Sequence, residues 1–129
     1  MEHDPIPSKD EELARQLIGA AIEVHRTLGP GFLESIYRRA LRHELSILAI
    51  PFEYEKKILV PYKEIKIPGQ RLDIVVAGRI ILEVKTVEIF APIHQAQLIS
   101  YLKATGLRLG FLINFNTQVL KNGIKRVVR

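Results

Sequence analysis

The residues best suited to chemistry lie in one short segment, in which Asp73 is followed by Glu83 and then by Lys85. If the chain folds back as a hairpin centred on Gly78, Asp73 and Glu83 face each other with Cβ atoms about 4.5–5.5 Å apart. Side chains alternate along a strand, so Lys85 shares the face of Glu83. The spacing therefore predicts two carboxylates and one ammonium group side by side.

Two carboxylates that face each other beside the apolar neighbours Val75, Ala77 and Ile81 repel each other and lose solvation. A hard divalent cation relieves this cost, because Mg²⁺ binds one or two carboxylates and keeps several waters. Lys85 can then orient or help deprotonate a metal-bound water, or stabilise charge on a phosphate. This is the chemistry of metal-assisted phosphodiester hydrolysis. In the alternative interpretation, Lys85 bridges the two carboxylates in a surface ion cluster.

The elements that must position this hairpin are indicated by apolar periodicity and by turn residues. Steps of three and four between apolar residues predict two helices, with Gly29-Pro30-Gly31 between them, and Pro92 suits the first turn of a third. Ser8 or Asp10 is a candidate cap for the first helix. The predicted helices cover residues 11–28, 33–48 and 92–105.

Segments rich in aromatic and β-branched residues predict the strands. Pro68-Gly69 is expected to form a turn between two of them. The predicted strands are 52–61, 62–67, 71–77, 79–87 and 107–115, with a short last strand or hook over 124–129. Together these elements indicate a single α/β domain over residues 10–129, in which helices flank a mixed sheet, preceded by a flexible segment over residues 1–9.

Composition narrows the class of protein. The chain has 129 residues, 47% of them hydrophobic and 26% charged, as in an ordinary globular domain. It has no cysteine, which excludes disulfide scaffolds, cysteine zinc sites and thiol nucleophiles. Neither a membrane span nor a signal peptide is visible, so a cytoplasmic protein is expected. Nineteen basic residues against 14 acidic ones give a formal charge of +5, which favours a polyanionic partner such as nucleic acid.

Asp73 and Glu83-Val84-Lys85 resemble the core motif of the PD-(D/E)xK nuclease superfamily, an aspartate followed by Glu-x-Lys on the next strand. Leu72 stands where the strict motif has proline. Gly31-Phe32-Leu33-Glu34-Ser35-Ile36-Tyr37 is similar to the motif that names the GxxExxY branch. Residues 22–31, 97–102 and 110–115 also resemble that branch, so the resemblance covers about residues 10–129.

The resemblance implies a restriction-endonuclease-like core and a nuclease that depends on Mg²⁺, with Mn²⁺ as a substitute. Asp73, Glu83 and the Val84 carbonyl would bind the metal. Lys85 would position the attacking water. Glu34 would add a third carboxylate, directly or through water; its alternative role is to complement a helix dipole.

Four more residues are candidates for the site. Gln97 and Tyr101 share a helix face, and the resemblance implies that they hold the nucleic acid; alternatively Tyr101 is half core and Gln97 is solvated. Tyr37 shares a face with Glu34. His25 lies close to the GxxExxY-like motif, although a lone histidine is more often structural than a ligand.

The expected partner is nucleic acid, with DNA favoured over RNA, and a protein partner can supply specificity to so small a domain. A resolvase-like variant of this interpretation predicts a two-fold homodimer with both sites facing one branched substrate. Two alternatives remain on the same fold. One is a catalytically silent nucleic-acid-binding domain, and the other is a regulatory protein–protein interaction domain.

Overall fold

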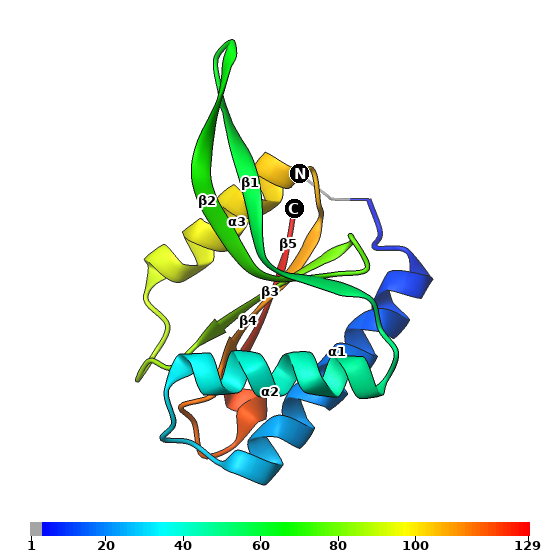
Figure 1. The fold of residues 1–129 in the computed structure, drawn as a ribbon, viewed down its shortest axis with the longest axis vertical. Helices are drawn as coiled ribbons and strands as arrows, with labels where there is room; N and C mark the ends of the chain where they lie inside the picture. The colour runs from blue at the N-terminus through cyan, green and yellow to red at the C-terminus, as the bar shows by residue number, and fades with distance from the viewer. Residues whose placement is uncertain (1–3) are drawn as a thin grey trace.

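A computed structural model describes residues 4–129, which form a five-stranded mixed sheet flanked by helices (Figure 1). The strands lie in chain order across the sheet; β3 and β4 are parallel, and the other neighbours are antiparallel. The predicted mixed α/β fold is confirmed. The elements are α1 (Ser8–Leu28), α2 (Glu34–Ile47), β1 (Phe52–Tyr62), β2 (Ile65–Val76), β3 (Ile80–Lys85), α3 (Pro92–Thr105), β4 (Leu109–Asn114), the 3-10 helix η1 (Leu120–Gly123) and β5 (Ile124–Val128).

The sheet has a core on each face. On one face, Ile74 and Leu82 pack with buried residues of α1 and α2. On the other face, Val75 and Ile81 pack against α3. Alternate residues of β2 and β3 therefore enter opposite cores. This explains why these central strands are almost continuously apolar in sequence.

The hairpin of β2 and β3 has the predicted register. Ile74 pairs with Leu82 and Val76 with Ile80, so the hairpin is centred on Gly78. Ala77, Gly78 and Arg79 form the three-residue loop that joins the last pair, and Ala77 and Gly78 both have positive φ, 52° and 65°. The length of this loop fixes which residues of β2 and β3 face each other.

The predicted turn at Pro68-Gly69 is wrong. The segments 62–67 and 71–77 belong mainly to one long strand, β2, and the chain reverses earlier, at Lys63, whose φ is 51°. Pro68 and Gly69 lie inside β2, where the register with β1 shifts. A β-bulge can hold a proline, which lacks an N–H, and a glycine with a φ of 121°, so these residues bend the strand without ending it.

The N-terminal segment departs in part from the prediction. Helix α1 begins at Ser8, and neither candidate residue caps it with its side chain. The Arg108 guanidinium donates to the carbonyls of Asp4 and Pro5. Residues 1–3 of the predicted flexible segment lie outside the described residues, and the flexibility itself stays a prediction. Among the residues described, no helix combines the length and the apolarity that a membrane span needs.

Candidate active site

Asp73 lies at the point where β2 exchanges faces. Leu72 packs in the core under α3, whereas Ile74 packs in the core under α1 and α2. Regular alternation would place both side chains on one face. Opposite Asp73 on β1, Glu55 has a φ of 48° and is left out of the regular strand pairs. This irregularity turns the Asp73 side chain toward the neighbouring strand, β3.

The carboxylates of Asp73 and Glu83 take over the hydrogen bonds that the ladder would make there. The regular β2–β3 pairs end at Ile74 and Leu82. Beyond them, the Val84 N–H donates to Asp73 Oδ2 at 2.8 Å, and the Asp73 N–H donates to Glu83 Oε2 at 2.8 Å. The two carboxylates are thus held side by side at the carboxyl end of β3. This confirms the juxtaposition that the hairpin register predicts.

The site is electrostatically unfavourable as it stands. Glu83 is 6% exposed, and this burial, followed by the negative charge of Asp73, raises the pKa of Glu83 to about 8. Burial also raises the pKa of Asp73, although the Val84 N–H and the Arg38 charge oppose the rise. Both carboxylates therefore resist ionisation, and a nearby cation would relieve the cost.

Lys85 lies close enough to lower the pKa of both carboxyl groups by its charge. Within residues 4–129, however, it makes no ion pair with either of them. The Lys85 carbonyl accepts a hydrogen bond from the Phe115 N–H at 3.0 Å, which holds the end of β3 against β4. The alternative of a surface cluster bridged by Lys85 therefore does not describe this site.

Glu34 reaches the site through Arg38. Glu34 is the first residue of α2, and its Oε1 accepts a 2.6 Å hydrogen bond from Arg38 Nη1. The same nitrogen lies 4.0 Å from Asp73 Oδ1. Arg38 was not among the predicted residues, although its spacing of four from Glu34 is a signal that could have identified it. Among the described residues, no three His, Asp or Glu side chains alone form a metal cluster.

Helix α3 contributes Tyr101 to the same region. Burial, and then the charges of Glu83 and Asp73, raise the pKa of the Tyr101 hydroxyl, so it lies within electrostatic range of the carboxylates. The Gln70 side chain on β2 opposes this rise. Gln97 is half-buried, one turn before Tyr101, and its amide makes no hydrogen bond within the described part of the chain.

The side chains of Tyr37 and His25 form hydrogen bonds with backbone groups. The buried Tyr37 hydroxyl donates to the Gly29 carbonyl at 2.5 Å and accepts from the Phe32 N–H at 3.1 Å, which fixes the loop before α2. His25 Nε2 lies 2.7 Å from the Thr117 carbonyl oxygen. These contacts support the elements around the site, and a direct role of either side chain stays a prediction.

Asn114 supports the site in a way that its sequence context does not reveal. It is 2% exposed, and its side-chain amide donates to the Val87 carbonyl at 2.7 Å. Its Oδ1 accepts from the N–H groups of Val87 and Asn116, both at 3.1 Å. These bonds tie the loop after β3 to the end of β4. In the sequence, Asn114 lies within the predicted strand 107–115, where no local pattern indicates these contacts.

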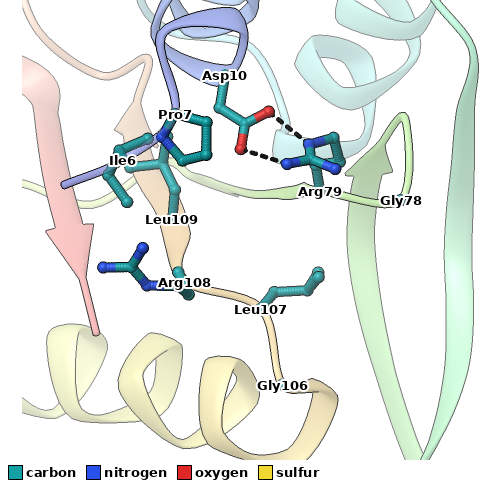
Figure 2. Close-up of a pocket in the computed structure, with 9 residues that line it drawn as sticks. All are labelled: Ile6, Pro7, Asp10, Gly78, Arg79, Gly106, Leu107, Arg108 and Leu109. Atoms are coloured by element: carbon teal, nitrogen blue, oxygen red, sulfur yellow. Dashed lines mark hydrogen bonds and ion pairs between the residues drawn. The ribbon is translucent and has the colours of Figure 1, made fainter. Parts of the chain in front are cut away.

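A second buried carboxylate lies at the opposite end of β3 (Figure 2). Arg79, just before β3, donates two hydrogen bonds to Asp10 of α1, one of them at 2.9 Å to Oδ2. This pairing lowers the pKa of Asp10. A hollow of about 220 Å³ adjoins the pair, lined by Ile6, Pro7, Asp10, Gly78, Arg79, Gly106, Leu107, Arg108 and Leu109. The charges of Asp10 and Arg79 neutralise each other.

Comparison with known proteins agrees with the geometry. The family model described as the PD-(D/E)XK nuclease superfamily matches residues 11–127. The match runs from α1 into β5 and includes both carboxylates at the end of β3. No curated protein and no solved structure matches the chain.

Proposed function

The chain belongs to the PD-(D/E)XK nuclease superfamily, and on this basis we propose that it is a Mg²⁺-dependent nuclease that hydrolyses phosphodiester bonds in DNA. Mn²⁺ would substitute for Mg²⁺. The motif over residues 31–37 supports its assignment to the GxxExxY branch. The proposed compartment is the cytoplasm.

The observation that carries this proposal is the buried carboxyl group of Glu83 beside the half-buried one of Asp73, where the ion pairing within the described residues is limited to Arg38, 4.0 Å from Asp73. Asp73 and Glu83 each use one oxygen on a backbone N–H, which leaves Asp73 Oδ1 and Glu83 Oε1 for another ligand. The N–H and C=O of a strand residue point to the same side, so the Val84 carbonyl faces the side on which its N–H meets Asp73. These are the hard oxygen donors that Mg²⁺ prefers. The donor set therefore fits the metal.

The residues around these donors have distinct proposed roles. A bound divalent cation would acidify a water and neutralise charge on the phosphate. Lys85 would hold the attacking water next to the carboxylates. Its ammonium group makes no ion pair within residues 4–129 and is available for this task. Glu34, held by Arg38, would accept hydrogen bonds from water at the site. Tyr101 and Gln97 on α3 would contact the substrate strand.

The test compares carboxylates at the two ends of β3. We would measure cleavage of labelled duplex, single-stranded and branched DNA and RNA with Mg²⁺ or Mn²⁺. Asp73→Asn and Glu83→Gln keep the shape of each side chain but remove its charge, so cleavage should fall more than about 100-fold. Asp10→Asn removes a buried carboxylate outside the site and should keep its cleavage rate.

Two results would refute the proposal. One is cleavage that survives in Asp73→Asn and Glu83→Gln. The other is a folded wild-type protein that neither cleaves any substrate nor changes its melting temperature with Mn²⁺. The second result would favour a silent nucleic-acid-binding domain or a regulatory protein–protein interaction domain.

A further inference from the structure

The hairpin of β1 and β2 projects beyond the rest of the sheet (Figure 1). We call residues 57–71 of this hairpin the arm. Only its base is covered, where Ile58 packs against Leu98 and Leu102 of α3. Residues 59–69 are exposed throughout. An isolated two-stranded ribbon is only marginally stable in water, so an arm of this length, without a supporting layer, suggests a surface that binds something.

One face of the arm carries cations that the protein does not neutralise. Lys57 and Arg71 lie directly opposite each other in the ladder. Like charges in that arrangement are destabilising, yet neither side chain makes an ion pair within residues 4–129. Nearby, Lys56 does pair with Glu53, at 2.8 Å. The Lys57–Arg71 pair is therefore a ready site for an anion.

A hollow lies beside this cation pair, at the β-bulge. Its volume is about 460 Å³, and it is lined by Lys57, Ile58, Leu59, Pro68, Gly69 and Arg71. Nothing lies within 4 Å of the position that a Gly69 side chain would take, so the bulge is open to solvent. Further along the arm, Lys66 lies opposite Pro61 in the ladder. Pro61 is four residues after Lys57 on β1, and residues an even number apart along a strand point to the same face, so Lys66 shares the face of Lys57. Three exposed cations thus follow one face.

The cation pair is close to the proposed reaction centre. Arg71 precedes Asp73 by two residues on β2, about 7 Å along an extended strand. One strand of duplex DNA carries a phosphate about every 3.4 Å of helix axis. A backbone that crosses the carboxylates would therefore pass the Lys57–Arg71 pair within about two phosphates.

We propose that the arm binds duplex DNA, with Lys57, Arg71 and Lys66 on backbone phosphates and the ribbon lying along the major groove. This inference rests on the proposed nuclease function and extends it to a substrate class. The major groove of B-form DNA, about 12 Å wide, admits a two-stranded ribbon. The major groove of A-form RNA is too narrow for side chains to read. The arm therefore selects duplex DNA over duplex RNA.

The other face of the arm is apolar and agrees with this occupant. Val60 pairs with Ile67, and Tyr62 with Ile65, and all four side chains are exposed. Apolar side chains in the major groove contact the thymine methyl group. A second copy of the chain is the competing occupant, but it would bring an equal set of unmatched cations. Duplex DNA matches them.

The test uses two triple variants with the same change in charge. The arm variant is Lys57→Ala/Lys66→Ala/Arg71→Ala. The control variant is Lys121→Ala/Lys125→Ala/Arg129→Ala, which removes three exposed cations near the C-terminus. Fluorescence anisotropy would measure binding to a labelled DNA duplex and to an RNA duplex of the same sequence, without divalent metal so that nothing is cleaved. Circular dichroism and melting temperature would confirm that each variant folds.

The arm variant should bind the DNA duplex at least about 10-fold more weakly than wild type, and its slope of log K against log salt should fall by about 3, one for each lost phosphate contact. The control variant should stay within about 2-fold of wild type, and RNA binding should be weak and unaffected by the arm variant. Wild-type cleavage and metal-dependent melting are measured separately. If the wild type shows neither cleavage nor metal-dependent melting but binds DNA through the arm, the catalytic proposal is refuted and the arm proposal is supported.

Several outcomes would overturn the arm proposal. Equal losses in the two triple variants would mean diffuse attraction by the whole basic surface. An arm variant that binds DNA as tightly as wild type would exclude the arm, as would a wild type that responds to metal but binds no DNA. Light scattering tests the second copy: a wild-type dimer that becomes monomeric in Tyr62→Lys/Ile65→Lys, with the triple arm variant unimpaired in DNA binding, would assign the arm to self-association.

Discussion

A buried carboxylate lies near each end of β3, and the two ends differ in how the negative charge is neutralised. Near its beginning, Asp10 accepts two hydrogen bonds from Arg79, and its pKa is lowered. At its carboxyl end, Asp73 and Glu83 lie beside each other, and their pKa values are raised. The nearest arginine nitrogen, on Arg38, stays 4.0 Å from Asp73.

The difference separates a structural carboxylate from a functional one. A buried charge with a hydrogen-bonded partner can hold a fold together, whereas a pair of buried like charges costs stability. Such a cost is tolerated where it serves a site. Lys85 could have neutralised Glu83 directly but makes no such ion pair. The electrostatic cost therefore remains at the carboxyl end of β3, whereas Arg79 removes it near the beginning of the strand.

The largest effect that would test this comparison is the pH dependence of metal-free stability. The pKa of Glu83 in the folded protein is about 8, above the value of 4.5 expected when the chain is unfolded. The folded state therefore holds this proton more tightly, and stability falls as the pH rises from about 4.5 to about 8. Glu83→Gln removes the charge and should recover on the order of a few kcal/mol above pH 8.

Urea unfolding at a series of pH values in a metal chelator measures this slope. Asp73 also has a raised pKa, so the slope should shrink in Glu83→Gln and not vanish. Asp10→Asn is the control, because the lowered pKa of Asp10 gives stability that is present above pH 3.8 and lost as the pH falls through the lowered value. An unchanged slope between pH 4.5 and 8 in Glu83→Gln would show that its carboxyl group is not strained.

The second prediction concerns added metal. Saturation with Mn²⁺ at about 100 times its dissociation constant stabilises a folded protein by about 2.7 kcal/mol. The wild type and Asp10→Asn should both gain this amount, measured by thermal melting, whereas Glu83→Gln should gain almost none. Equal gains in all three proteins would mean that the metal binds elsewhere and would remove the functional distinction between the two ends of β3.

The carboxyl end of β3 was largely predictable from sequence because it depends on local geometry. A three-residue loop over 77–79 sets the register, and continuing that register beyond the pair of Ile74 and Leu82 brings Asp73 next to Glu83. Spacings of three and four on helices likewise gave most of the helix boundaries. Such patterns work over short separations, where backbone geometry decides which residues face each other.

The other end was not predictable, because Asp10 and Arg79 meet across 69 positions of sequence. The sequence interpretation took Asp10 as a possible cap, since caps are local and ion pairs between distant elements leave no periodic signal. The arm was misread for a related reason. Pro68 and Gly69 are residue types typical of a turn. Only the pairing of β2 with β1, which is not visible in the sequence, makes them part of a β-bulge instead.

The third prediction is the loss of stability when the ion pair of Asp10 and Arg79 is broken. Asp10→Asn loses the charge of a hydrogen-bonded ion pair, and because the Arg79 side chain is 41% exposed, water replaces part of that interaction. We expect the melting temperature at pH 7 to fall by about 2–4 °C. At a pH well below 3.8, where Asp10 of the wild type is itself protonated, the two proteins should melt together. A difference that persists there would assign the loss to packing.

The smallest effect concerns Arg38, which neutralises Asp73 only in part. Arg38→Gln removes a positive charge near the carboxylates, so Mn²⁺ should bind about 2–5-fold more tightly, by less electrostatic repulsion. Arg39→Gln, which changes an exposed neighbour on α2, is the matched control and should leave the affinity unchanged. Titration of Mn²⁺ by thermal melting measures both.

The opposite result for Arg38→Gln would be equally informative. Arg38 also holds Glu34 through a 2.6 Å hydrogen bond. If the variant binds Mn²⁺ more weakly than wild type, the loss of that bond outweighs the relief of repulsion, and Glu34 must then contribute to the metal site. The sign of one affinity change thus decides whether Arg38 acts as an incomplete counterpart of Arg79 or as the support of a third carboxylate.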